Sequence, residues 1–346
     1  MPAAGEKGAS PLAAQMKILV TGGAGYVGSA CLRWLLRRGH DPIAFDSLAQ
    51  GNRGAVPEGR LVVGDIEDRE ALGAALARHQ SEAVMHFAAV ASVPESVADP
   101  ELYYRVNVGG TKNVLDAMRE HGVERIVFSS TAATYGFQAE MPLREDSPRL
   151  PETPYGKTKL AAEWLIEDYR RAYGIGCVLL RYFNASGADP DGEYGEDRRD
   201  EHHLIPLVLQ AALGKRDELR ICGADWPTQD GTCVRDYVHT DDLAQAHQLA
   251  IEALSPGEGR VYNVGSGRGF SVREVLAACE EVVGHAIPQR VVERRPGDPA
   301  VLIASSDKLA SELGWKPRYR DVRAIVETAW RWHQRCPDGY ASKTTS

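Results

Sequence analysis

Short apolar segments alternate with amphipathic helical patterns along the first half of the chain. The apolar segments are continuous and do not alternate with polar residues, which is typical of strands covered by helices on both faces. The expected strands are Lys17–Val20, Pro42–Asp46, Leu61–Gly64, Ala83–Ala88, Arg125–Ser129 and Cys177–Phe183. The expected helices are Gly25–Arg38, Arg69–Arg78, Tyr103–His121 and Tyr155–Tyr173. This series predicts an α/β fold built on a doubly wound parallel (Rossmann) sheet.

Beyond Asn184 the pattern changes to a loop at 188–199 that is rich in Gly, Asp and Glu, followed by shorter elements. The expected helices are His203–Leu213, Asp241–Leu254, Val272–Val283, Ser306–Leu313 and Asp321–His333, and the expected strands are Leu219–Cys222, Arg235–His239, Val261–Val264 and Arg290–Glu293. We expect residues 16–184, with segments returning near 235–265, to form the Rossmann domain. We expect residues 185–340 to form mainly a smaller C-terminal α/β lobe that binds substrate. Residues 1–15 are expected to be a disordered extension and residues 341–346 a loose tail.

Length and composition narrow the class of protein. The chain has 346 residues, of which 43% are hydrophobic and 25% charged, so a globular protein with more than one core is expected. A net charge of -8 without a basic stripe argues against nucleic-acid binding. The six cysteines form no C-x-x-C pair, which favours free thiols and a cytoplasmic location. No apolar run is long enough to suggest a membrane partner.

A glycine-rich segment joins the first expected strand to the first expected helix. Gly22, Gly25 and Gly28 follow a G-x-x-G-x-x-G spacing, with Tyr26 and Val27 between the last two. Glycines allow a tight turn and a close approach of the backbone to a pyrophosphate, and the helix N-terminus supplies free N–H groups. The strand–turn–helix context therefore predicts a dinucleotide site.

Residues at the ends of the next strands identify the dinucleotide. Asp46 closes the second strand, where a carboxylate accepts hydrogen bonds from the adenosine ribose and repels the 2′-phosphate of NADP. NAD is therefore the expected cofactor. Further contacts are expected from Ser47, Asp65, Ile66, Phe87, Ala88 and Ala89, and from Asn107, a poor helix former inside an expected helix.

Tyr155 and Lys159 are four residues apart and share one face of an expected helix. A free tyrosine is a poor base at neutral pH, but a nearby ammonium and the positive nicotinamide ring favour its phenolate. Thr131, at the end of the fifth strand, is expected to hydrogen-bond the reacting oxygen, while Ser129 is expected beside the cofactor. No cluster with metal-ligand spacing is visible, and the chemistry requires no metal.

Together, these motifs resemble the extended short-chain dehydrogenase/reductase family. Within it, the chain is similar to UDP-glucose 4-epimerases over about residues 16–340. The runs that carry this resemblance are 86–89 (HFAA), 94–96 (PES), 128–131 (FSST), 180–184 (LRYFN), 230–239 (DGTCVRDYVH) and 294–298 (RRPGD). The run at 230–239 is the most specific of them.

The resemblance implies a substrate, UDP-glucose or UDP-galactose, bound next to NAD, and a homodimer paired through the helices Tyr103–His121 and Tyr155–Tyr173. It implies that Asn184, Arg235 and Arg295 hold the diphosphate and that Asp298 reaches the uridine ribose. Two guanidinium forks suit a diphosphate. Further implied contacts are Tyr182 with the cofactor and Thr131, Tyr155, Phe183, His203, Leu204, Arg220, Cys222 and Leu302 with the substrate.

Three positions depart from the family pattern. His203 replaces an asparagine that contacts phosphate, and Cys222 replaces an aromatic residue that stacks on uracil, so base affinity is in question. Leu302 lies near the position whose bulk controls entry of N-acetylated sugars, and its size favours non-acetylated hexoses.

The resulting hypothesis is a 4-epimerase of UDP-glucose and UDP-galactose, which oxidises C4 transiently and returns the hydride without stereospecificity. A 4-epimerase of UDP-xylose, UDP-glucuronate or UDP-N-acetylglucosamine remains an alternative. A nucleotide-sugar 4,6-dehydratase is disfavoured because Ala132 and Ala133 stand where such enzymes carry Asp-Glu after the threonine. A non-catalytic NAD-binding protein on the same fold is disfavoured by Thr131, Tyr155 and Lys159.

Overall fold

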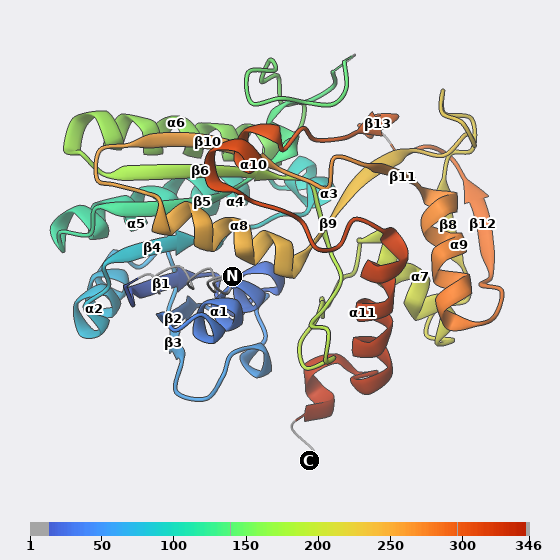
Figure 1. Ribbon diagram of the computed structural model, residues 1–346, viewed down its shortest axis with the longest axis horizontal. Helices are drawn as coiled ribbons and strands as arrows, with labels where there is room; N and C mark the ends of the chain where they lie inside the picture. The colour runs from blue at the N-terminus through green and yellow to red at the C-terminus, as the bar shows by residue number, and fades with distance from the viewer. Residues whose placement is uncertain (1–13, 139, 296, 344–346) are drawn as a thin grey trace, which may run out of the picture.

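A seven-stranded sheet forms the main layer of the protein (Figure 1). The computed structural model describes residues 14–138, 140–295 and 297–343. The strand order is β10-β6-β5-β4-β1-β2-β3, and every neighbouring pair is parallel. Their bounds are β1 (Lys17–Thr21), β2 (Asp41–Asp46), β3 (Leu61–Val63), β4 (Ala83–His86), β5 (Arg125–Thr131), β6 (Gly176–Tyr182) and β10 (Gly259–Val264). The predicted doubly wound α/β sheet is confirmed.

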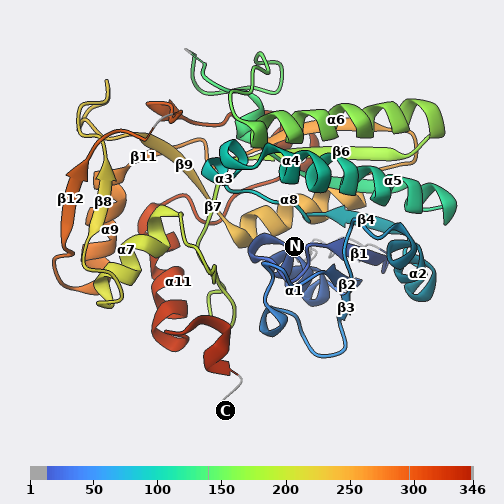
Figure 2. The same ribbon diagram turned by 180° about the vertical axis from the view of Figure 1, so that it is seen from behind.

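Helices cover both faces of this sheet, as Figures 1 and 2 show from opposite sides. One face packs against α1 (Tyr26–Arg37), α8 (Thr240–Glu252) and α10 (Asp307–Leu313). The other face packs against α2 (Arg69–His79), α5 (Thr111–Glu120) and α6 (Pro154–Tyr173). Successive strand residues point to opposite faces, so Ile18 and Val20 enter one core while Leu19 enters the other. This burial on both sides explains the continuous apolar runs in the sequence.

The helix expected at Tyr103–His121 has a different construction. It consists of α4 (Pro100–Tyr103), a π-helical segment at Tyr104–Gly110 and then α5, and it follows a short helix that was not predicted, α3 (Val93–Ala98). The wide π-helical turn contains Asn107, which is buried and hydrogen-bonds both backbone groups of Val90. Such turns commonly mark functional sites, and here the turn lies behind the segment that follows β4.

The C-terminal half adds two small sheets and three further helices (Figure 2). In one sheet β9 (Val234–His239) pairs with β7 (Asn184–Ser186), β11 (Gly269–Ser271) and β13 (Val301–Leu302). The other pairs β8 (Leu219–Cys222) with β12 (Gln289–Val292). The helices α7 (Leu204–Ala212), α9 (Val272–Val283) and α11 (Val322–Arg335) bury a separate core against them.

Of the segments expected to return to the main sheet near 235–265, α8 and β10 lie there. The expectation is wrong for β9, which belongs to the four-stranded sheet of the smaller lobe. β7, β11 and β13 were not predicted, because strands of two or three residues leave no periodic signal.

Three short 3-10 helices complete the fold: η1 (Arg53–Ala55), η3 (Ala132–Thr134) and η4 (Gly339–Lys343). The last one falls partly in the tail expected to be loose at 341–346, so the chain is helical as far as Lys343. Tyr340 anchors it, because its ring lies 4.8 Å from that of Trp332 and its hydroxyl donates to the carbonyl of Gly195. Most of the expected N-terminal extension (1–13) and residues 344–346 lie outside the described residues. Among those described, no helix is both long and apolar enough to cross a membrane.

Candidate active site

A cleft of about 660 Å³ opens at the carboxyl ends of β1, β2 and β4. In doubly wound folds ligands bind at this edge of the sheet. The lining includes most of the residues expected to hold the dinucleotide, namely Gly22, Gly25, Tyr26, Val27, Gly28, Asp46, Ser47, Asp65, Ile66, Phe87, Ala88, Ala89 and Tyr182. The structure therefore brings together residues that are up to 160 positions apart in the chain.

The glycine turn leaves room for a phosphate at the start of α1. A β-carbon at Gly28 would lie 2.2 Å from the carbonyl oxygen of Gly22, and one at Gly22 would lie 2.5 Å from the amide nitrogen of Ala88. Gly22 also has a φ of +70°, which disfavours other residues. The first turn of α1 has no acidic residue and no side-chain cap, so its N–H groups remain open to an anion. This turn fits the pyrophosphate of a dinucleotide.

Asp46 ends β2 at the wall of the same cleft. Its Oδ2 accepts a hydrogen bond from the amide of Ala24 at 2.9 Å, and its Oδ1 accepts one from the amide of Leu48 at 2.8 Å. Burial raises the pKa of this carboxyl, while the two amides oppose that shift. The carboxylate is thus fixed where a ribose is expected, and its negative charge disfavours a 2′-phosphate there.

Tyr155 and Thr131 meet where α6 approaches the end of β5. Thr153 caps α6 by accepting a hydrogen bond from the amide of Gly156, which sets Tyr155 in the first turn. The hydroxyl of Tyr155 hydrogen-bonds Thr131. Burial raises the pKa of Tyr155, and the hydrogen bond to Thr131 and the charge of Arg198 act in the opposite direction. Lys159, the residue expected to lower this pKa, is not among these causes.

Lys159 lies one turn further along α6, and its ammonium is turned toward β5. Its Nζ donates to the carbonyl of Ser129 at 2.9 Å and lies 4.6 Å from the ring centre of Phe128. Burial lowers the pKa of this amine to about 7, although the carboxylate of Glu163 raises it. The Ser129 hydroxyl in turn hydrogen-bonds that of Tyr182, which lines the cleft. A polar chain thus runs from the cleft to the helix that carries Tyr155.

Asn107 does not line the cleft. Its side-chain amide accepts a hydrogen bond from the backbone N–H of Val90 and donates one to the Val90 carbonyl. The same Nδ2 also donates to the hydroxyl of Thr158 at 3.1 Å. Since Val90 itself lines the cleft, Asn107 shapes the wall from behind. The unusual residue type indicated a specific hydrogen bond, and within the protein its partner is the backbone of Val90.

Most residues expected to bind substrate lie outside this lining, and some of them are in contact with one another. Phe183 and Leu302 pack in one cluster with Ala132, directly after Thr131. Leu302 is paired with Arg235 between β13 and β9, and a guanidinium nitrogen of Arg235 lies 3.7 Å from a carboxylate oxygen of Asp298. Asn184 begins β7, beside Tyr237 of β9.

The remaining predicted substrate residues lie on two separate elements, β8 and the start of α7, or near them. Arg220 is exposed on β8, and Cys222, at the end of that strand, is half-buried, with its carbonyl accepting a hydrogen bond from the indole of Trp226 at 3.0 Å. The charge of Arg295 acts on His202, next to His203 at the start of α7. Leu204 is the first residue of that helix.

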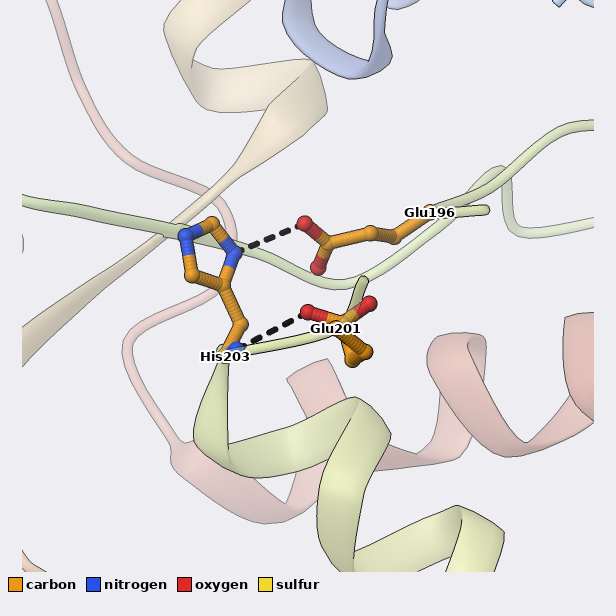
Figure 3. A group of neighbouring side chains, drawn as sticks. All are labelled: Glu196, Glu201 and His203. Atoms are coloured by element: carbon orange, nitrogen blue, oxygen red, sulfur yellow. Dashed lines mark hydrogen bonds and ion pairs between the residues drawn. The ribbon is translucent and has the colours of Figure 1, made fainter. Parts of the chain in front are cut away.

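His203 faces a buried carboxylate (Figure 3). Its Nδ1 lies 2.7 Å from Oε1 of Glu196, and its backbone amide donates to Glu201 at 2.8 Å. Ligand atoms of these three residues lie within 4.8 Å of one another, a spacing that can suit a metal ion. The Nε of Arg198 lies 2.7 Å from the same oxygen of Glu196, so a guanidinium already supplies the positive charge there. We therefore interpret the group as an ion-pair network.

Sequence reasoning missed one wall of the cleft. It is formed by Gly195, Asp197, Arg198, Arg199, Asp200 and His202 from the loop between β7 and α7, and by Tyr340 from η4. The loop was recognised only as a loop, because its Gly- and Asp-rich sequence has no periodicity. Nothing in the sequence indicates that it folds back onto the glycine turn.

The fold and the cleft define a dinucleotide-dependent enzyme of the doubly wound α/β class. Residues 18–265 match the NAD dependent epimerase/dehydratase family, and the chain belongs to that family. It is 50% identical over 329 residues to a UDP-glucose 4-epimerase of Halalkalibacterium halodurans, covering 95% of this chain and 98% of the relative.

Two solved structures are similar over nearly the whole chain. The UDP-glucose 4-epimerase of Brucella ovis in complex with NAD is 45% identical, with a TM-score of 0.88 over 91% of this chain and 97% of that one. The UDP-glucose 4-epimerase of Bifidobacterium longum in complex with NAD+ and UDP is 36% identical, with a TM-score of 0.89 over 93% and 99%. The expected cofactor, NAD, is confirmed at the level of the family.

Proposed function

We propose that this protein is a UDP-glucose/UDP-galactose 4-epimerase. The observation that carries the proposal is the hydrogen bond between Tyr155 and Thr131, next to the cluster of Phe183 and Leu302. Relatives that are about half identical over nearly the whole chain bear the same activity in their names, which supports the substrate. Residues 16–184 with α8 and β10 would serve the cofactor, and the remaining C-terminal lobe the UDP-sugar.

In the proposed reaction Tyr155 removes the proton from the sugar 4-hydroxyl. Thr131 hydrogen-bonds the same phenol and supports its anionic form. NAD, when bound, supplies the chemistry of accepting a hydride from C4 and giving it back. Lys159, whose Nζ donates to the carbonyl of Ser129, is proposed to hold the nicotinamide ribose. After the 4-keto sugar has rotated to present its other face, Tyr155 returns the proton to the oxygen at C4.

The smaller lobe would retain the nucleotide while the sugar rotates. Arg235 and Arg295 are proposed to bind the diphosphate with Asn184, and Asp298 to bind the ribose, with His203, Leu204, Arg220 and Cys222 near the nucleotide. Arg235 already pairs with Asp298 at 3.7 Å, so its side chain is held at this position before any ligand binds. Binding energy from the remote nucleotide can then anchor an intermediate that must move.

The test is conversion of UDP-galactose to UDP-glucose by the purified protein without added cofactor, followed by chromatography. Tyr155→Phe should abolish conversion, because it removes the proton acceptor. Tyr173→Phe, an exposed tyrosine at the other end of α6, is the matched control and should convert normally. Failure of the wild-type protein even with added NAD would contradict the proposed substrate and favour UDP-xylose, UDP-glucuronate or UDP-N-acetylglucosamine.

We also propose a cytoplasmic homodimer. Cys31, Cys177, Cys222, Cys233 and Cys279 are free thiols, which supports a reducing compartment. Large apolar side chains are exposed on α3, α6 and the π-helical segment, which lie together on one side of the sheet (Figure 2); they are Val97, Tyr104, Trp164 and Tyr173. Pairing through this surface would bury them. A monomer in analytical ultracentrifugation would contradict the proposal.

A further inference from the structure

The loop between β7 and α7 is held against the cofactor cleft from two sides. The hydroxyl of Tyr26, in the first turn of α1, donates to the carbonyl of Gly187 at 2.5 Å. Further along, Asn52 donates to the carbonyl of Asp197 at 2.9 Å, and the indole of Trp332 on α11 donates to that of Glu196 at 3.0 Å. These anchors fix the part of the loop that lines the cleft.

Arg198 lines the cleft. Its charge acts on the phenols of Tyr26, Tyr155 and Tyr182. Tyr26 lies at the glycine turn, where the pyrophosphate of the cofactor is expected. Tyr182 lines the cleft and hydrogen-bonds Ser129, where the nicotinamide is expected. The guanidinium is therefore within electrostatic reach of both parts of a bound dinucleotide.

The network around Glu196 holds this guanidinium in place. The Nε of Arg198 donates to Oε1 of Glu196 at 2.7 Å, and the carboxylate side chain is only 4% exposed. His203 contacts the same oxygen (Figure 3). Burial alone would raise the pKa of Glu196, but His203 and Arg198 bring it down to about 2. Among the described residues, Arg198 makes its hydrogen bond to Glu196 through Nε. Its two terminal nitrogens therefore remain available to a ligand.

Two groups on opposite sides of the cleft suit a pyrophosphate. The N-terminus of α1 carries a partial positive charge and no acidic residue in its first turn, and Arg198 brings a second positive charge to the same cleft. A dinucleotide pyrophosphate carries two negative charges and presents oxygens that a guanidinium fork can bind. An anion of this kind between them would accept hydrogen bonds from the N-terminus of α1 and from the terminal nitrogens of Arg198.

We propose that Arg198 is a cofactor-anchoring residue, whose guanidinium binds the NAD pyrophosphate from the side opposite the N-terminus of α1. The loop then acts as a fixed strap across the cofactor, and the tight NAD binding that repeated turnover requires depends partly on it. The inference rests on the NAD requirement of the family and not on the identity of the sugar. It can therefore fail while the proposed epimerase activity holds, and the reverse.

The test compares wild-type protein, Arg198→Met and Arg198→Lys. Bound NAD is first removed, and the affinity for NAD is then measured by calorimetric titration. Methionine keeps the aliphatic stem without the charge, and lysine keeps the charge without the fork. Loss of a charge-assisted hydrogen bond should weaken NAD binding by about 10- to 100-fold in Arg198→Met, and less in Arg198→Lys. Arg320→Met, an exposed arginine outside the lining of the cleft, is the control and should bind NAD like the wild type.

Two further ligands locate the contact. ADP-ribose retains the pyrophosphate and should lose as much affinity as NAD in Arg198→Met, whereas adenosine should lose none. Unchanged ADP-ribose affinity would place Arg198 at the nicotinamide and overturn the proposal. So would a loss of UDP affinity with NAD binding intact, because Arg198 would then serve the substrate. If Arg198→Met does not fold, as judged by circular dichroism, Arg198→Lys is tested with the same three ligands, and a smaller loss of NAD and ADP-ribose affinity is expected.

Discussion

A buried ion pair fixes the helix that carries Tyr155 and Lys159 to the central sheet. Arg181 on β6 donates two hydrogen bonds to Glu163 on α6, from Nε at 2.8 Å and from Nη2 at 2.7 Å. The two side chains are only 3% and 1% exposed. Ser130, next to Thr131, also donates to Glu163 at 2.5 Å. Glu163→Met therefore removes the acceptor of three hydrogen bonds from two buried side chains and leaves a buried guanidinium charge uncompensated.

The expected loss of stability is large. Breaking a buried pair by removing one partner costs about 3–5 kcal/mol, because the remaining charge stays desolvated. The remaining partners of Arg181 are the hydroxyl of Tyr135 at 3.0 Å and the carbonyl of Glu145 at 3.2 Å, and neither is charged. Replacing both residues by methionine removes the charge as well, so the double variant should lie within about 2 kcal/mol of the wild type.

The assay is urea denaturation of the wild type, Glu163→Met, Arg181→Met and the double variant at one fixed NAD concentration, since bound cofactor adds to apparent stability. The four free energies form a double-mutant cycle, and the expected coupling is about 3 kcal/mol. A Glu163→Met variant that loses less than about 1 kcal/mol would refute the reasoning. So would additive single losses in the double variant, because they would show that the uncompensated charge is not the cause.

Three further predictions concern the cleft and its loop. Burial and Glu196 raise the pKa of Glu201 from 4.5 to about 7, so the stability that its protonated form contributes is lost as pH rises from about 4.5 to about 7. Glu201→Gln should therefore have a higher urea midpoint than the wild type at pH 8 and the same midpoint at pH 4.5. A difference that does not change with pH would contradict this. Gly28→Ala should purify without NAD, judged by its absorbance ratio at 260 and 280 nm, because its β-carbon would lie 2.2 Å from the carbonyl of Gly22. Asp46→Asn should shift the ratio of NADP to NAD affinity upward by about 10-fold or more, since a repelling charge is removed; an unchanged ratio would place the ribose elsewhere.

Much of the fold was predictable because single segments carry their own signal. The strands β1, β4 and β5 are buried on both faces, so each appears as an uninterrupted apolar run. The glycine turn was equally clear, since Gly22 and Gly28 stand where a β-carbon would collide with backbone. In such places the local preference of the sequence agrees with the conformation in the folded structure.

Other features depend on partners far away in the chain. β7 and β13 are too short to be recognised, and their extended form is set by pairing with β9. The position of Arg198 depends on hydrogen bonds that its loop makes with Asn52 and Trp332, more than a hundred residues away on either side. Asn107 was recognised as unusual, but only the structure shows that it bonds Val90. Contacts of this kind cannot be inferred from composition or periodicity.

The central claim is that the hydrogen at sugar C4 leaves as a hydride and returns to the same carbon within the cleft. The direct measurement uses UDP-galactose with deuterium at C4, converted in ordinary water and examined by mass spectrometry and NMR. The account predicts UDP-glucose that retains the deuterium at C4, formed more slowly than from the unlabelled sugar, and no conversion by Tyr155→Phe. Loss of the deuterium to solvent would contradict it, because the hydrogen would then have left as a proton.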